Sequence, residues 1–315
     1  MKKGTIKKYV LNFAPLFGLI ALVAAFFCLG TIKDINIAYG LKSVLNQSIV
    51  VAVVATGAIF IYTLGSFDIS LGASVAVSAL LGGMVYNKTQ NLWVMVAVSV
   101  LISLINSVLA CVFNLPVFVT TIAMLSVLNA LVLLLIKING TGSEIAVPAA
   151  AVKPLNNISF KIIILLIFFI VCLFLFSFTK IGRKQKFLGG NAICAKLTGI
   201  SDKKMAIVAF AIAGVGVGLG AFLSTIYAPT LTKNTASSVG MDVIIAIVFG
   251  GMPVSGGAKS RIYAALIGAF SMTFLSQIMV MFNLNSGVGQ MVKAVIFLLV
   301  VFLSTSDQRG KLLPR

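Results

Sequence analysis

The sequence predicts an all-α integral membrane protein with about ten transmembrane helices, some of them broken, and with both termini in the cytoplasm. Sixty per cent of the 315 residues are hydrophobic and only 10% are charged, whereas an ordinary soluble domain has roughly 25% charged residues. Apolar blocks of about 18 residues or more recur along the whole chain, which is typical of membrane-spanning helices. Basic residues gather in the short stretches between these blocks and at the termini, as they do where positive charge sets membrane orientation.

The first five apolar segments are separated by short polar breaks. Four lysines within Met1–Lys8 place the start of the first segment in the cytoplasm. The apolar run that follows continues to about Gly30 without a small-residue cleavage site, so we interpret it as a retained helix and not as a signal peptide. The segments are expected at about 10–30, 44–64, 72–86, 92–113 and 117–136.

A basic interval divides the chain after its sixth segment. That segment, about 162–178, follows a loop over 137–161 that is expected to be external. Six crossings return the chain to the cytoplasm at 180–204. This interval contains seven basic residues and one acidic residue, which gives a net charge of +6. The count of crossings and the charge therefore agree. Four segments follow, at about 206–227, 239–249, 262–282 and 288–303, and residues 1–315 are expected to form one transmembrane domain.

The composition excludes most catalytic chemistry. The chain has no histidine, its four cysteines are far apart, and it contains neither a phosphate-binding Gly-x4-Gly-Lys-Ser/Thr motif nor paired carboxylates. We therefore expect no catalytic residue, no bound cofactor and no metal site. The net charge of +18 is spread over loops beside apolar segments and carries no aromatic-interleaved patch, so we expect no nucleic-acid partner.

The first helix break, Gly65–Gly72, contains Asp68, the only acid within the apolar segments of the N-terminal half. Ionisable groups near the bilayer core are costly and usually face a cavity, a partner or an interface. Asp68 either caps a helix that begins near Ile69 or lines a substrate path. Ser70 can satisfy backbone groups that the break leaves free.

Other polar residues lie at later breaks. Thr120 and Thr121 follow the break at Pro116, and either bond back to their own helix or line a polar path. Asp242, in the short segment 239–249, either caps that helix or lies at the membrane interface. The candidate path and break residues are Gly65, Asp68, Ser70, Gly72, Pro116, Thr120, Thr121, Asp242, Gly250, Gly251, Ser255 and Gly257.

Glycine spacing indicates two further features. Gly214, Gly216, Gly218 and Gly220 form two overlapping Gly-xxx-Gly spacings, which we interpret as sites of close helix packing. An internal repeat is the second hypothesis, because transporters often carry helix breaks at corresponding places in two halves. At a constant offset of 185, Gly65, Ser70, Gly72 and Ala73 match Gly250, Ser255, Gly257 and Ala258.

The basic interval contains a predicted short helix. Gly189-Gly190-Asn191 predicts a turn and an N-cap, Ala192–Thr198 about two helical turns, and Gly199 the helix end. A helix this short is marginal alone. It either docks in a partner's groove through Ile193, Leu197 and Ile200 or lies on anionic headgroups, and the residues leave both alternatives open.

Four stretches, in this order, resemble the permease subunits of bacterial ABC importers for simple sugars of the ribose, xylose and galactoside type. Gly65–Gly72 is similar to that family's GGIDLSVG, and Leu115–Thr121 to its LPPFIATLG. Gly182–Ile200 is similar to GR…AIGGN…AA…SGI, and Gly240–Gly257 to GYELDAIAAVVLGG…SGG. The similarity covers about 42–302.

The resemblance implies a non-catalytic subunit of the bacterial cytoplasmic (inner) membrane that moves a monosaccharide, a ribose-like pentose or a hexose. Its partners would be cytoplasmic ATPase subunits that bind the ATP, an extracytoplasmic sugar-binding protein, a second copy or a homologous permease, and the lipid bilayer. The coupling residues would be Arg183, Gly189, Gly190, Asn191, Ile193, Ala195, Leu197, Gly199 and Ile200. Bulky residues at Gly190 or Gly199 are then expected to abolish uptake. The alternatives are an ABC permease for nucleosides or another small polar solute, and an ion-driven secondary transporter.

Overall fold

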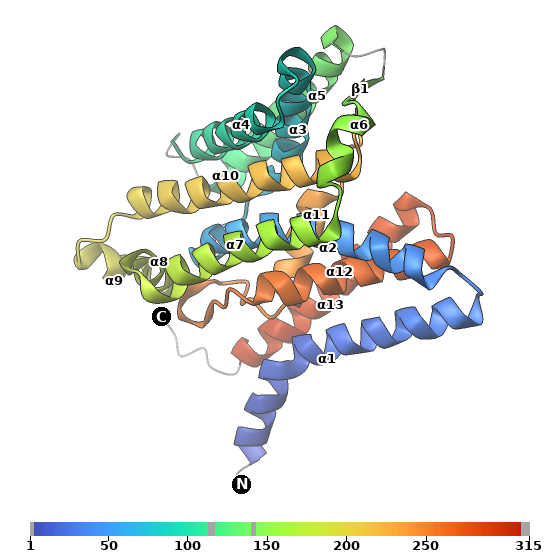
Figure 1. Cartoon of the computed structure of the whole chain (residues 1–315). Helices are drawn as coiled ribbons and strands as arrows, with labels where there is room; N and C mark the ends of the chain where they lie inside the picture. The colour runs from blue at the N-terminus through green and yellow to red at the C-terminus, as the bar shows by residue number, and fades with distance from the viewer. Residues whose placement is uncertain (1–2, 113–116, 140–142, 310–315) are drawn as a thin grey trace.

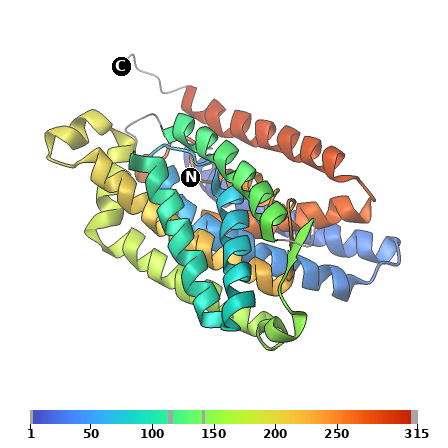
Figure 2. The ribbon, with the colours of Figure 1, turned by 90° about the horizontal axis from the view of Figure 1, so that it is seen from above.

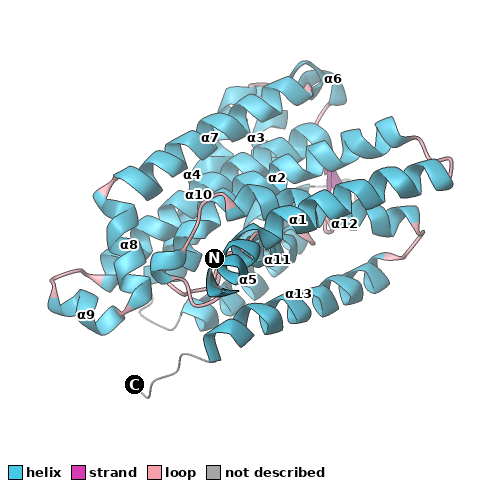
Figure 3. Ribbon diagram, turned by 90° about the horizontal axis from the view of Figure 1, so that it is seen from below, coloured by secondary structure: helices cyan, strands magenta, loops and turns pink. Residues whose placement is uncertain are grey.

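The computed structural model describes residues 3–112, 117–139 and 143–309, and within these the side chains of 3–12, 110–112, 286 and 303–309 are left out. Most of this part of the chain is helical (Figure 3). One helix coincides with each predicted apolar segment: α1 (Lys3–Ile32), α2 (Ile37–Thr63), α3 (Leu71–Thr89), α4 (Leu92–Val112), α5 (Val117–Asn139), α7 (Ile158–Phe178), α10 (Asp202–Tyr227), α11 (Val239–Phe249), α12 (Ala264–Met281) and α13 (Ser286–Arg309).

Seven of the described helices are long and apolar enough to cross a membrane, namely α1, α2, α4, α5, α7, α10 and α12. The chain is therefore an all-α, multi-pass membrane protein. Helix α11 has 11 residues, and at 1.5 Å per residue it covers about half of a hydrocarbon core that is about 30 Å thick. The short segment predicted over 239–249 thus coincides with this helix, and the number of full crossings stays a prediction.

Helix α2 forms the centre of the bundle. It packs against α10, α12 and α7, which run alongside it in Figure 1. The most apolar window of α2 is 89% buried, whereas that of the peripheral helix α1 is 11% buried. Helix α13 runs along one edge of the bundle when it is seen from above (Figure 2). The core is thus built around α2, and α1 and α13 lie at the periphery of the bundle.

The four glycines of α10 are confirmed as sites of close helix packing. A Cβ added at Gly214 would lie 2.9 Å from the Cα of Leu104 on α4. A Cβ added at Gly216 would lie 3.0 Å from the carbonyl oxygen of Val53 on α2. Gly218 faces α4 and Gly220 faces α2 in the same way. The two overlapping spacings therefore let α10 approach two neighbours at once.

The two ends of the bundle carry different structures. At one end, named here the sheet end, strands β1 (Glu144–Ala146) and β2 (Thr230–Thr232) pair antiparallel, with Ile145 opposite Leu231. The short helices α6 (Ala149–Val152) and η1 (Lys153–Leu155) follow β1. The opposite end, the α9 end, carries α8 (Lys180–Gly190), α9 (Ala192–Leu197) and η2 (Gly257–Lys259) (Figure 1). The sheet was not predicted, since we interpreted 137–161 as a loop.

A buried lysine ties the sheet end to the core. Lys161, at the start of α7, is 1% exposed and donates hydrogen bonds from Nζ to Asn46 Oδ1 on α2 (2.5 Å) and to Asn156 Oδ1 (2.6 Å). Two amide oxygens thus compensate a cation that would otherwise be costly to bury. This contact fixes the segment after β1 against the central helix.

Candidate functional site

The basic interval folds into two helices, of which the sequence predicted the second. Asn191 caps α9 as predicted, because its Oδ1 accepts a hydrogen bond from the Cys194 N–H (3.0 Å). Gly199 has φ +78°, and the N–H groups of Gly199 and Ile200 donate to the carbonyls of Lys196 and Ala195 (both 3.0 Å), which closes the helix in a Schellman motif. The predicted turn at Gly189-Gly190 was wrong, since both glycines lie in the last turn of α8.

Helix α9 presents two large apolar side chains to its surroundings. Ile193 is 74% exposed and Leu197 is 83% exposed, and they lie four residues apart on one face of the helix. Ala195 is fully buried against the rest of the protein, and Ile200, the third predicted anchor, is half-buried. Burying an exposed Ile or Leu contributes about 1.5–3 kcal/mol, so these two side chains are suited to a partner's groove.

The end of α8 sits in a backbone-to-backbone junction that three sequence motifs form together. A Cβ added at Gly189 would collide with the carbonyl oxygen of Thr63, at the end of α2, and would lie 3.0 Å from the nitrogen of Gly257. A Cβ added at Gly256 would lie 2.6 Å from the Thr63 carbonyl oxygen and 2.7 Å from the nitrogen of Gly65. The segment leading into α9 therefore touches the first helix break, Gly65–Gly72, and a second one, Gly250–Gly257.

Close backbone packing, more than side-chain hydrogen bonding, holds this junction together. Three of its side chains are buried without a hydrogen-bond partner among the described residues: Tyr62 at the end of α2, Gln185 on the buried face of α8 and Ser260 after η2. Lys186 of α8 instead lies over the ring of Phe176, with Nζ 4.1 Å from the centroid, and burial lowers the pKa of its ammonium group. Arg183 is exposed and does not enter the junction.

The first break is organised by Asp68. This residue is 2% exposed, and its Oδ1 accepts hydrogen bonds from the Ser70 N–H (2.8 Å) and the Ser70 hydroxyl (2.6 Å). Gly65 begins the break with φ +75°. The carboxylate thus closes a local turn immediately before α3, which is the geometry of the capping alternative. The path-lining alternative stays a prediction.

We expect Asp68→Asn to be tolerated and Asp68→Ala to destabilise the protein by about 1–3 kcal/mol. An asparagine oxygen can accept both hydrogen bonds, whereas alanine leaves the buried donors of Ser70 unpaired. Thermal unfolding of both variants in detergent, together with uptake in cells, checks this. An asparagine variant as inactive as the alanine variant, yet as stable as the wild type, would favour the path-lining alternative.

The end of the first break also contacts the start of α11. Gly72, in the first turn of α3, faces the first turn of α11, since an added Cβ would lie 2.8 Å from the nitrogen of Gly240. The second break contains Gly250, which is packed against the carbonyl of Ala264, and Gly251 with φ +91°. In backbone conformation Gly65 therefore corresponds to Gly251, one residue from the match that the sequence suggested. The internal repeat stays a hypothesis.

The threonines of α5 bond to their own helix. The Thr120 hydroxyl donates to the carbonyl of Val117 (2.9 Å) and the Thr121 hydroxyl to that of Phe118 (3.1 Å). Both side chains are buried. The backbone-bonding alternative thus describes their geometry. Pro116 lies outside the described residues, and Ser255 is exposed at the α9 end.

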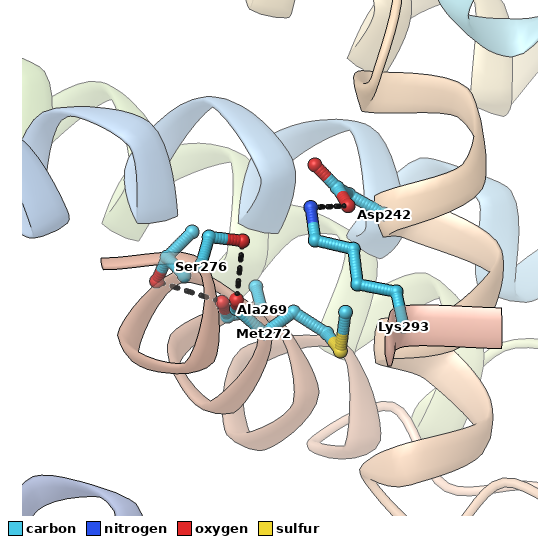
Figure 4. Close-up of polar contacts among 6 residues, drawn as sticks. Asp242, Ala269, Met272, Ser276 and Lys293 are labelled. Carbon is cyan, nitrogen blue, oxygen red and sulfur yellow. Dashed lines mark hydrogen bonds and ion pairs between the residues drawn. The ribbon is translucent and has the colours of Figure 1, made fainter. Parts of the chain in front are cut away.

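Asp242 has a partner that sequence reasoning missed. Lys293 of α13 donates from Nζ to Asp242 Oδ1 at 2.6 Å, and the two side chains are 12% and 13% exposed (Figure 4). Neither the capping nor the interfacial alternative anticipated this ion pair. The signal was available, because a lysine inside an apolar helix needs a partner and Asp242 is one of two acids within apolar segments. The pair joins α13 to α11 beside α12.

The apolar bundle with its interrupted helices is that of a multi-pass membrane protein. The family model described as "Branched-chain amino acid transport system / permease component" matches residues 40–303, so the chain belongs to this family. It is therefore a non-catalytic permease subunit of an ABC transporter, which confirms the class that the four motifs predicted.

Several curated relatives match over most of the chain. The ribose import permease protein RbsC of Escherichia coli strain K12 is 25% identical over 280 residues, covering 85% of this chain and 86% of RbsC. The autoinducer 2 import system permease protein LsrC of Photorhabdus luminescens is 25% identical and covers 91% of this chain and 85% of LsrC. The xylose transport system permease protein XylH of Haemophilus influenzae is 30% identical over 154 residues, 49% of this chain and 41% of XylH. No solved structure matches the chain.

Proposed function

We propose that the chain is the permease of an importer that moves a monosaccharide, a ribose-like pentose or a hexose, across the bacterial cytoplasmic membrane. The relatives named for ribose and xylose support the substrate class. A separate ATPase subunit binds and hydrolyses the ATP. The observation that carries the proposal is the exposed apolar face of α9, formed by Ile193 and Leu197, beside a glycine junction that reaches both helix breaks.

The charge of the α9 end supports its assignment to the cytoplasm. The interval 180–204 has a net charge of +6, and basic residues accumulate on the cytoplasmic side of membrane proteins. In this orientation the ATPase binds α9. A movement of α9 is then transmitted to α2 and η2 through the contacts of Gly189. The sheet end then faces outward, toward an extracytoplasmic sugar-binding protein.

A second permease copy, or a homologous permease, completes the path in this proposal. Helix α5 supports it with Asn129, an exposed amide near the middle of a 23-residue apolar helix, beside the exposed Ser126. Polar side chains in transmembrane helices commonly bond across to a neighbouring helix or face a wet cavity. A second copy against α5 would provide either environment.

We expect the double variant Ile193→Ser/Leu197→Ser to lose its ATPase while the permease itself stays stable. Both side chains are exposed, so their truncation leaves the core of this chain intact, whereas removing two interface anchors costs about 2 kcal/mol each. The measurement is co-purification of a P-loop ATPase with the tagged chain from its native host. Ile32→Ser is the matched control, because Ile32 is 77% exposed at the opposite end.

Transport is measured in the same variants with radiolabelled ribose and xylose, and with a nucleoside and a branched-chain amino acid as competitors. The proposal predicts ATP-dependent sugar uptake that the double variant loses and the control keeps. Uptake by the purified chain alone in proteoliposomes, driven only by an ion gradient, would contradict it and establish the secondary transporter.

A further inference from the structure

The sheet end is more basic than membrane orientation requires. It carries seven lysines and two acidic residues, Asp34 and Glu144, a net charge of +5. Positive charge at this end works against the asymmetry that places the α9 end in the cytoplasm. The lysines of the sheet end therefore call for another explanation.

Two of the seven lysines have structural roles. Lys33 donates from Nζ to the carbonyl of Met281 (2.9 Å) and lies over the ring of Phe282, 4.1 Å from the centroid. Lys161 is buried between two asparagines, as described above. Both hold one segment of this chain against another.

The other five lysines are exposed: Lys42, Lys88, Lys137, Lys153 and Lys233. The ion pairs among the described residues are Lys196–Asp202 and Lys293–Asp242, so none of these five lysines has an acidic partner in that part of the chain. Glu144 is half-buried in β1 and does not pair with them. Their charge is available to a partner.

Three of these lysines surround the small sheet and are named here the lysine rim: Lys88, Lys137 and Lys233. Lys88 lies in the last turn of α3 and Lys137 in the last turn of α5, and both helices pack against β1. Lys233 directly follows β2. The Asn87 amide donates to the carbonyl of Ala146 (2.9 Å) and ties α3 to the strand. The three lysines thus lie on elements that contact one another around the sheet.

We infer that the lysine rim is a docking surface for an acidic face of the sugar-binding protein, an inference that rests on the proposed function. Complementary charge steers association and fixes the orientation of a complex. The surface is also placed to transmit a movement of the bound partner. The chain continues from β2 through 233–238 into α11, and the first turn of α11 packs against α3 and carries Asp242. A partner seated on the sheet touches the segment that leads to both helix breaks.

The test compares two triple variants in nanodiscs of phosphatidylcholine, which carries no net charge. In Lys88→Glu/Lys137→Glu/Lys233→Glu the rim is reversed, and in the matched control the same three positions are changed to arginine. The probe is a purified extracytoplasmic sugar-binding protein of the native host, and its association and dissociation rates are measured at low and high salt. We expect the reversed rim to weaken binding by about tenfold or more at low salt, mainly through slower association, and the arginine control to bind like the wild type.

The outcomes separate this inference from the proposed function. If the wild type binds and the reversed rim binds equally well with the same salt dependence, the docking surface is overturned while the importer stands. If binding to all three proteins is equal and only the addition of anionic lipid distinguishes them, the rim serves lipid headgroups and the inference is also wrong. If the wild type itself does not bind the probe in any nucleotide state of its ATPase, the proposed function fails with it.

Discussion

Replacing Gly189 by alanine is expected to lower transport about tenfold or more while the chain still inserts into the membrane. The added Cβ would overlap the carbonyl oxygen of Thr63 and crowd the nitrogen of Gly257. These are backbone atoms, so no side chain can rotate away to make room. Overpacking of a tight site typically costs about 1–3 kcal/mol, occasionally more. Each 1.4 kcal/mol changes a population about tenfold, so we expect uptake to fall by about tenfold or more.

The neighbouring glycine is the matched control. A Cβ added at Gly190 would meet nothing within 4 Å, and alanine is a better helix former than glycine by up to about 1 kcal/mol. Gly190→Ala should therefore transport like the wild type. The sequence had led us to expect sensitivity to bulky residues at Gly190 or Gly199, and the open space at Gly190 now makes Gly189 the more sensitive of the two neighbouring glycines. A bulky residue at Gly199 is still expected to be harmful, because the φ of +78° there is strained for any side chain, although the surrounding space is open.

Sugar uptake, membrane insertion and ATPase co-purification are measured for both variants. The expected pattern is loss of uptake in the Gly189 variant alone, with the ATPase still bound through the unchanged α9. Equal uptake by the two variants would show that the junction of α8 with α2 and η2 does not transmit movement. Loss of insertion in the Gly189 variant would instead assign the contact to folding.

The helices could be predicted well from the sequence because a membrane-spanning helix requires a long run of apolar residues. About 18 consecutive apolar residues are needed to span the hydrocarbon core, and breaks in such a run are visible in one dimension. Local capping is equally readable, since Asn191 and Gly199 act within their own helix turn. The α9 helix was therefore predicted almost to its residue bounds. Helix α8 was missed because two glycines at its end looked like a turn.

Contacts between segments that are distant in the sequence could not be predicted from the sequence. Nothing in the local pattern tells that Gly189 would meet Thr63, since the two residues lie on separate elements and glycine carries no side-chain signal. The pairing of β1 with β2 joins segments that are both short and weakly patterned. Lys293 differs from these contacts, because a charged residue in an apolar helix indicates that a partner exists. Only the identity of that partner, Asp242, required the structure.

Removing either member of the Asp242–Lys293 pair is expected to destabilise the protein by about 3 kcal/mol. The atoms are 2.6 Å apart and the side chains are 12% and 13% exposed, so truncating one leaves the other charge nearly buried and uncompensated. We therefore expect Lys293→Met and Asp242→Leu each to lower the unfolding temperature in detergent. The double variant should recover most of the loss, because apolar residues of similar volume can replace a buried ion pair at little cost.

The second ion pair of the described residues supplies the control for this experiment. Lys196 and Asp202 are 2.9 Å apart, but their side chains are 59% and 56% exposed, and an exposed pair contributes about 0–1 kcal/mol. Lys196→Met should therefore hardly change the unfolding temperature. Because the Asp242–Lys293 pair joins α13 to α11, its loss should also reduce uptake in the single variants, and the charge-swapped Asp242→Lys/Lys293→Asp should restore part of it. Single variants as stable as Lys196→Met would show that α13 is held to α11 by apolar packing alone.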